Sequence, residues 1–226
     1  FGTSELEYEY FLLEECSALL ESFDAVSVRE DSGVQLCDEW FDCDRAVHVL
    51  DPVMLLGVEQ YKNIAASATE RKAKGKIATY ILDRSLVKSN VVDFVVRCTG
   101  KEVADISVYP KDRNLPLSDR IVPPMADWIA GFEEADFVVT DSFHGCVMSI
   151  LFHKPFLVIG NNVRGLSRVQ SLLNIFGLES RLVEGIDPDD DGEGWLMDLD
   201  WDRVDTVLEQ WRTGSMAFLS DSLASK

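Results

Sequence analysis

The chain has 226 residues, 46% of them apolar, and its 40 acidic against 21 basic residues give a formal net charge of −19. That length supports a sizeable core, whereas so acidic a surface repels phosphate backbones and excludes nucleic acid from the predicted partners. No window approaches the roughly 20 unbroken apolar residues of a membrane helix, and the first residues lack the basic start and apolar run of a signal peptide.

The first third of the chain predicts short elements. Apolar residues near the start recur at three- and four-residue spacing, as in an amphipathic helix, and Asp24 ends that pattern. Two short apolar runs then predict buried strands. The expected elements are helices over 6–23 and 29–39, strands over 25–28 and 47–50, and an exposed polar connection over 68–75.

From residue 77 onward, apolar strands alternate regularly with amphipathic helices. Strands are expected over 77–82, 102–108, 136–140, 156–160 and 180–183. Helices are expected over 87–98, 125–134, 143–152, 167–176 (ended by Gly177) and 200–223. In this last helix we expect a break at Gly214 and core-facing Trp201 and Trp211, with sugar stacking as the alternative role for the two tryptophans.

This alternation predicts an α/β fold, in which a Rossmann-like parallel sheet is covered by helices on both faces. Sheets of this kind bind ligands at the carboxyl ends of their strands. The segments after Leu82, Val108, Thr140 and Gly160 are therefore the candidate site.

The five cysteines are scattered, odd in number and without a Cys-x-x-Cys pair. They predict neither a disulfide framework nor a zinc site, and a reducing cytoplasm fits them best. A peripheral position at the inner face of the membrane stays open. We expect Cys16, Cys37 and Cys146 to be packing residues, because each has apolar neighbours at helical spacing.

The run 140–145, Thr-Asp-Ser-Phe-His-Gly, lies where a strand ends and a helix begins. Asp141 or Ser142 is a natural N-cap, and the positive end of the helix suits a phosphate or carboxylate. His144, in the first turn, can exchange a proton near neutral pH, and Gly145 allows another chain or a ligand to approach closely. The alternative is an ordinary capped helix with a buried, hydrogen-bonded histidine.

The other two histidines have structural interpretations. His48 lies inside a predicted strand, and His153 lies at a predicted helix end, where it compensates the helix dipole.

A second polar cluster, over 160–168, follows the next strand. Arg164 and Arg168 stand in a loop with glycine and asparagine, and paired guanidinium hydrogen bonds can hold a carboxylate or phosphate there. The alternative is that Ser167 caps a helix and the arginines are solvated. Residues 187–198 are similar to a calcium loop, but Pro188 and Asp198 depart from the pattern, so we interpret them as a solvated acidic loop and predict no metal.

Taken together, these stretches resemble the polysaccharide pyruvyl transferase family. The matching residues are Phe-Asp-Ala-Val-Ser-Val-Arg-Glu-Asp-Ser-Gly over 23–33, Asp51-Pro52, the segment 135–145, Lys154-Pro155-Phe156, Asn161, Arg164-Gly165, Ser167-Arg168 and the helix that begins at Asp200-Trp201. The resemblance implies a two-domain fold of the GT-B type, of which this chain supplies the C-terminal domain. The sequence begins without Met, and the N-terminal domain of the same protein is an expected partner. On this basis we expect a linking segment over 1–67, a donor-binding domain over 68–199 and a helical tail over 200–226.

The resemblance also implies an activity: transfer of a pyruvyl group from phosphoenolpyruvate to a sugar hydroxyl, as a ketal on a bacterial cell-surface polysaccharide. Phosphoenolpyruvate would be a co-substrate, a saccharide the acceptor, and no cofactor is expected. His144 would be the general acid or base. The implied substrate-binding residues are Arg29, Asp141, Ser142, Phe143, Asn161, Arg164 and Arg168, with the amides of Ser142 and Phe143 assisting the arginines. The alternative for Arg29 is a buried salt bridge with Glu30 or Asp51.

One position departs from part of the family, because Ser142 stands where some members carry an arginine two residues before the histidine. Two other functions therefore stay open. A glycosyltransferase that uses a sugar nucleotide could bind phosphates at the same helix start. A non-catalytic module that binds a sugar or a partner could keep the fold without the chemistry.

Overall fold

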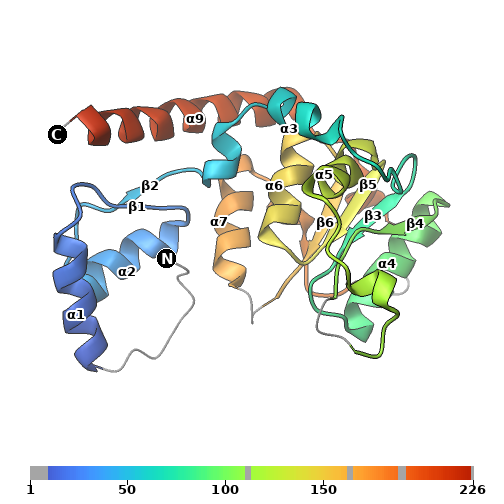
Figure 1. Ribbon diagram of the computed structural model, residues 1–226, viewed down its shortest axis with the longest axis horizontal. Coiled ribbons are helices and arrows are strands. Elements are labelled where there is room, and N and C mark those ends of the chain that lie inside the picture. The colour runs from blue at the N-terminus through green and yellow to red at the C-terminus, as the bar shows by residue number, and fades with distance from the viewer. Residues whose placement is uncertain (1–9, 110–112, 162–164, 188–191, 225–226) are drawn as a thin grey trace. The chain divides into compact units, whose positions relative to one another are not determined.

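In the computed structural model, the described residues are 10–109, 113–161, 165–187 and 192–224 (Figure 1). The chain divides into two compact units. Unit 1 comprises 1–55, 161–177 and 202–226, and unit 2 comprises 56–160 and 178–201. These boundaries differ from the expected ones at 67/68 and 199/200, because 161–177 group with the first and last parts of the chain; the domains of the longer protein stay a prediction.

Unit 2 is built on a parallel sheet that has five strands among the described residues, in the order β4-β3-β5-β6-β7. The strands are β3 (Ile77–Tyr80), β4 (Val103–Asp105), β5 (Phe137–Thr140), β6 (Phe156–Ile159) and β7 (Leu182–Val183). The α/β class and the parallel sheet are thus confirmed. The strands lie inside the ranges predicted from the apolar runs and are shorter, because only part of each apolar run pairs with a neighbouring strand.

The two faces of this sheet carry different helices. Residues at alternate positions, such as Ile77 and Val139, form a core with Phe94 of α4 (Leu86–Thr99). The intervening Tyr80 and Thr140 point to the other face, where they meet α5 (Met125–Glu134) and α6 (Phe143–Leu151). Helices therefore cover both faces, as the near-continuous apolar strands predict.

Local capping residues mark the start and the end of helix α4 in unit 2. The Ser85 hydroxyl accepts from the Lys88 amide and caps α4, which ends at Gly100 with φ 66°. The remaining helical elements of this unit are α3 (Val58–Ala65), which packs on α5, the short α8 (Glu193–Leu196), and the 3-10 turns η2 (Leu117–Arg120) and η4 (Glu179–Arg181). Neither α3 nor α8 was predicted from the sequence, because α3 is only eight residues long, although Tyr61 and Ala65 are buried on one face of it, and α8 is a single turn of four residues.

Unit 1 contains a short parallel pair, β1 (Ser27–Val28) with β2 (Val47–His48). Among its described residues, the helical elements are α1 (Tyr10–Glu21), α2 (Asp31–Phe41), η1 (Pro52–Leu55), α7 (Leu166–Phe176) and, from its second residue, α9 (Trp201–Ala224). A small core includes Leu20, Val26 and Cys37. Gly177 ends α7 in the left-handed region with φ 61°, as predicted.

The expected break at Gly214 is wrong, because α9 continues through it. Val204 and Leu208 are buried on this helix, whereas Trp201 and Trp211 are half-buried. Trp211 meets the ring of His48 edge-on within unit 1, and Trp201 stacks on His153 within unit 2. Both tryptophans thus pack against a histidine at the margin of a core.

All five cysteines are free thiols. Cys37 and Cys146 are buried, as a packing role requires, and Cys16 is half-buried. Complete burial raises the pKa of the Cys146 thiol, which therefore stays neutral. Among the described residues, none of the helices is both long enough and apolar enough to cross a membrane.

Candidate functional site

The turn between β5 and α6, residues 140–145, is called the α6 turn below. The Thr140 hydroxyl donates to the Tyr80 carbonyl at 2.7 Å and accepts from the Ser142 amide at 3.1 Å. Ser142 is the N-cap, because its hydroxyl accepts from the Gly145 amide. The cap is thus Ser142 rather than Asp141, and the Ser142 amide, which was expected to assist an anion, already has an internal partner.

Packing explains the glycine at position 145, and this reason differs from the one expected from the sequence. A Cβ at this position would lie 2.2 Å from Oγ1 and 2.8 Å from Cβ of Thr140. The group that approaches closely is therefore a strand residue of the same unit, and the expected approach of another chain or a ligand is not what requires glycine here. The contact holds the first turn of α6 directly against the end of β5.

Asp141 is a connector inside unit 2. Its carboxylate is fully buried and accepts from the amides of Leu82 and Asp83, at 2.7 and 3.2 Å, and from Lys88 Nζ at 2.6 Å. The ammonium of Lys88, also nearly buried, donates to the Asp83 carbonyl as well. Asp141 therefore ties the α6 turn to the loop that follows β3. Its contact with substrate stays a prediction, and sequence spacing contained no signal for its pairing with Lys88.

His144 lies in the first turn of α6 and is half-buried. Its ring meets the ring of Phe143 edge-on, with centroids 5.3 Å apart. Phe143 itself is buried, so the ring shields one side of the imidazole. The histidine is thus held in position at the carboxyl edge of the sheet and is not sealed in the interior, which is the placement that proton exchange with a bound molecule requires.

The remaining predicted substrate residues belong to unit 1, which is described separately. Arg29 Nη1 lies 2.6 Å from Asp51 Oδ2, so the alternative of a salt bridge is formed. Arg168, in the first turn of α7, is half-buried and folds its guanidinium over Gly165. Asn161 is half-buried, and Arg164 lies outside the described residues. Their approach to His144 stays a prediction about the assembled protein.

Serines of α7 organise the end of β1 in unit 1. Ser167 does not cap α7, whose N-cap is Gly165; its hydroxyl donates to the buried carboxylate of Glu30 at 3.1 Å. Ser171 accepts from the Asp31 amide at 3.0 Å and lies 3.5 Å from His48 Nε2. The polar residues after β1 are therefore held by α7.

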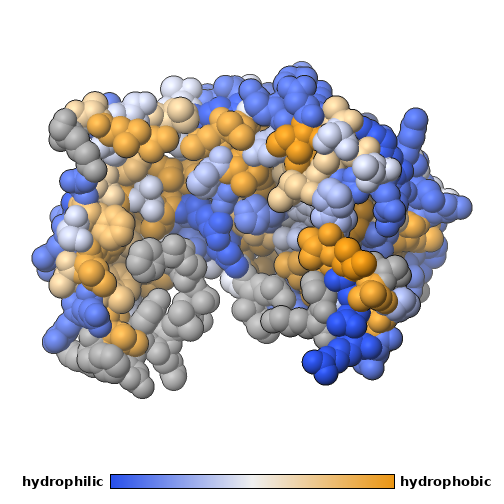
Figure 2. All heavy atoms as spheres, viewed as in Figure 1, coloured by the Kyte–Doolittle hydropathy of each residue, from blue (hydrophilic) through white to orange (hydrophobic). Residues whose placement is uncertain are grey.

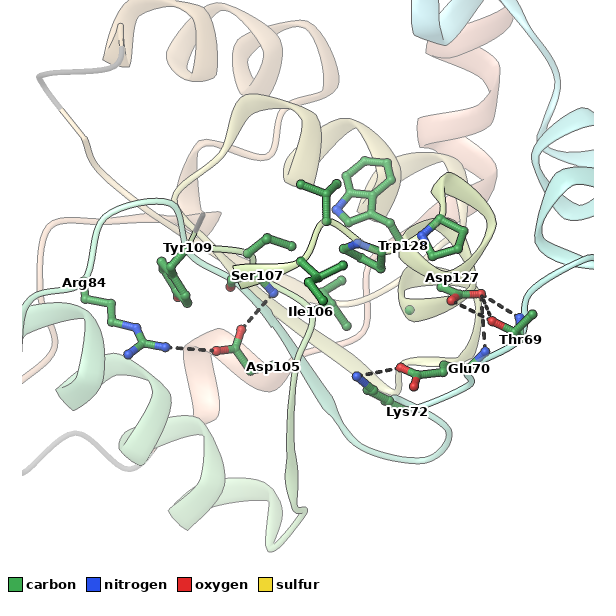
Figure 3. Close-up of a pocket in the computed structure, with 16 residues that line it drawn as sticks. Thr69, Glu70, Lys72, Arg84, Asp105, Ile106, Ser107, Tyr109, Asp127 and Trp128 are labelled. Carbon is green, nitrogen blue, oxygen red and sulfur yellow. Dashed lines mark hydrogen bonds and ion pairs between the residues drawn. The ribbon is translucent and has the colours of Figure 1, made fainter. Parts of the chain in front are cut away.

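A cavity of about 610 Å³ lies at the carboxyl end of β4, also within unit 2 (Figure 3). We call it the β4 cavity. Its polar walls come from the segment 69–72 before β3 and from the loops after β3 and β4, and its apolar wall comes from the segment before α5 and from α5 itself. The lining residues used below are Glu70, Lys72, Arg84, Asp105, Ser107, Tyr109, Ile121, Val122, Asp127 and Trp128. The segments after Leu82 and Val108 were both expected at the site, but no motif indicated a cavity there.

No arrangement of three or more His, Cys, Asp or Glu side chains suited to a metal ion occurs in the described part of the chain. Residues 188–191 of the calcium-like loop lie outside that part.

Comparison with known proteins now identifies the family. A family profile described as polysaccharide pyruvyl transferase matches residues 2–163. The chain belongs to the polysaccharide pyruvyl transferase family. The match contains the α6 turn and Arg29, and it ends before Arg164 and Arg168, so those two arginines have only the residue-level resemblance behind them.

Solved structures with similarity to the chain include two of the wall teichoic acid polymerase TagF, both of a histidine-to-asparagine variant, the second soaked with CDPG. Each is 13% identical over 93% of this chain, with TM-scores of 0.40 and 0.41. This chain spans about half of the TagF chains it matches, 55% and 54%. Among curated proteins, none matches significantly. The GT-B arrangement of two domains stays an expectation about the longer protein.

Proposed function

We propose that the chain is part of an enzyme that transfers a pyruvyl group from phosphoenolpyruvate to a sugar hydroxyl during synthesis of a cell-surface polysaccharide. The observation that supports this most is the half-buried imidazole of His144 at the start of α6, inside the residues that match the pyruvyl transferase family. Both the family and the placement of an acid-base group at the ligand-binding edge of a parallel sheet agree with it.

The reaction needs a proton, a nucleophile and a place for anions. The His144 imidazolium donates a proton to C3 of the enol, and C2 then becomes oxocarbenium-like. A sugar hydroxyl adds to C2 as its proton passes to a base, and a second hydroxyl of the same sugar displaces inorganic phosphate to close the ketal. The positive end of α6 favours the substrate's negative charge, with Arg29, Asn161, Arg164 and Arg168 as the further proposed contacts.

Binding and product analysis on the full-length protein test this proposal. Phosphoenolpyruvate should raise the melting temperature, whereas nucleotide sugars should not. Incubation with phosphoenolpyruvate and a saccharide acceptor should release inorganic phosphate and give an acceptor that carries a pyruvate ketal by mass spectrometry. Stabilisation by a nucleotide sugar alone, with glycosyl transfer, would instead identify a glycosyltransferase.

A further inference from the structure

Two oppositely charged side chains in the polar wall of the β4 cavity, Asp105 and Arg84, stand slightly apart. Oδ2 of Asp105, at the end of β4, lies 3.8 Å from Nη2 of Arg84. That separation is too long for a direct hydrogen bond. It suits one bridging hydroxyl, which would donate to the carboxylate and accept from the guanidinium.

Neighbouring contacts hold these two groups in place. Oδ1 of Asp105 accepts from the Ser107 amide at 2.9 Å and from the Thr79 hydroxyl at 3.3 Å. The guanidinium of Arg84 lies over the ring of Tyr109, 3.9 Å from its centroid. Both side chains are about half exposed, at 53% for Arg84 and 45% for Asp105. Both groups line the cavity.

The opposite wall is apolar and aromatic. Ile121 and Val122 are 62% and 68% exposed, and Figure 2 shows hydrophobic spheres gathered over the segment between η2 and α5. Trp128, from the first turn of α5, stands across the cavity from Tyr109 (Figure 3). Its buried indole nitrogen has no hydrogen-bond partner among the described residues.

The charges of the cavity select among ligand classes. Among the described residues, the two cations that line it lie beside a carboxylate, since Lys72 pairs with Glu70 at 2.7 Å and Arg84 faces Asp105. A phosphate would meet these carboxylates and be repelled. A neutral polyol can hydrogen-bond to both partners of each pair and pack its C–H faces on the apolar walls. The volume of the cavity lies in the usual range for a small-ligand site, about 300–1,000 Å³.

We propose that the β4 cavity binds a neutral saccharide, the acceptor of the pyruvyl group, through Asp105, Arg84 and Tyr109. The acceptor assignment rests on the proposed function, whereas saccharide binding does not. Only β3 separates β4 from β5 in the sheet, so the cavity and the α6 turn share one edge, two strand spacings or roughly 10 Å apart. Asp141 holds the loop that leads to Arg84 and thereby couples the two places.

Binding is measured on the full-length protein by saturation-transfer NMR, with methyl hexosides, lactose, cellobiose and maltose as probes and with inorganic phosphate and UMP as competing classes. Asp105→Asn should weaken the best glycoside about tenfold, the equivalent of one charge-assisted hydrogen bond, and should strengthen phosphate binding because Arg84 loses its carboxylate. Tyr109→Leu should also weaken the glycoside, and Tyr109→Phe should restore it.

The matched control is Asp136→Asn, which removes another half-exposed carboxylate of unit 2 that pairs with Lys101 outside the cavity. This variant should bind like the wild type. Equal glycoside binding by Asp105→Asn and wild type, binding of UMP or phosphate alone, or no binding of any glycoside overturns the cavity proposal. Because these readouts need no pyruvyl transfer, failure of transfer with intact glycoside binding would sink only the acceptor role and the proposed function.

Discussion

The α6 turn and the β4 cavity lie on the same edge of one sheet, yet they treat their polar groups in opposite ways. In the turn, the Thr140 hydroxyl, the Ser142 amide and the Asp141 carboxylate all have internal partners at normal distances. In the cavity, Asp105 and Arg84 stand slightly too far apart for a direct hydrogen bond to each other, and the Trp128 nitrogen has no hydrogen-bond partner among the described residues. The groups of the turn thus position one side chain, His144, whereas the groups of the cavity are the ones that we propose to bind a saccharide.

The largest loss of stability is expected when the ammonium beside Asp141 is removed. Lys88→Met leaves a fully buried carboxylate without its counter-charge, and we expect a loss of about 3–5 kcal/mol in the free energy of unfolding. Urea denaturation measures it. The matched control is Lys62→Met, whose exposed pair with Glu59 should be worth at most about 1 kcal/mol. Equal losses in the two variants would contradict the description of Asp141 as the internal anchor of the turn.

The next largest loss of stability is expected when a single methyl group is added at Gly145. Gly145→Ala places Cβ against the side chain of Thr140, and we expect overpacking to cost about 3 kcal/mol. Gly214→Ala is the control, since a Cβ there meets nothing within 4 Å inside α9, and it should stabilise the helix by up to about 1 kcal/mol. Opposite melting-temperature shifts are expected. A neutral Gly145→Ala would mean that α6 is not fixed against β5.

On the cavity side, Asp127 should show a smaller and pH-dependent effect. Burial alone would raise the pKa of its carboxyl, but hydrogen bonds from the amides of Thr69 and Glu70 and from the Thr69 hydroxyl lower it below the ordinary 3.8. A depressed carboxyl pKa stabilises the folded state fully above pH 3.8, and the contribution is lost as the pH falls through the folded value. Asp127→Asn should therefore be less stable than wild type at neutral pH, and the deficit should shrink on acidification. A deficit independent of pH would contradict this.

The smallest effect is expected at Trp128. Trp128→Phe keeps an aromatic ring beside Tyr80 and Phe132 and removes a buried donor that makes no described bond. The lost contacts and the relieved donor should nearly cancel, so thermal unfolding should show a change below about 1 kcal/mol. A large destabilisation would show that the indole nitrogen has a partner in the folded protein, which would weaken the contrast between cavity and turn.

Much of unit 2 could be predicted from the sequence, because buried parallel strands are apolar runs and capped helices carry local signals such as Ser85 and Gly100. The N-cap at Ser142 and the end of α7 at Gly177 were predictable for the same reason. Long-range polar pairing was not, since nothing in the spacing of Lys88 and Asp141 relates them. The β4 cavity was also beyond sequence reasoning, because its walls come from segments that are far apart in the sequence: 69–72, Arg84, 105–109 and 121–131. The break predicted at Gly214 was wrong, since a helix tolerates one exposed glycine at a cost of only about 1 kcal/mol.

The most direct test of the account compares two histidines at opposite ends of α6. In the full-length protein, His144→Gln should abolish formation of the pyruvate ketal while the melting temperature and phosphoenolpyruvate binding stay close to wild type. His153→Gln, which changes an exposed ring stacked on Trp201 beyond the other end of the helix, should retain transfer. Undiminished transfer by His144→Gln would contradict the assignment of His144 as the proton-transferring residue.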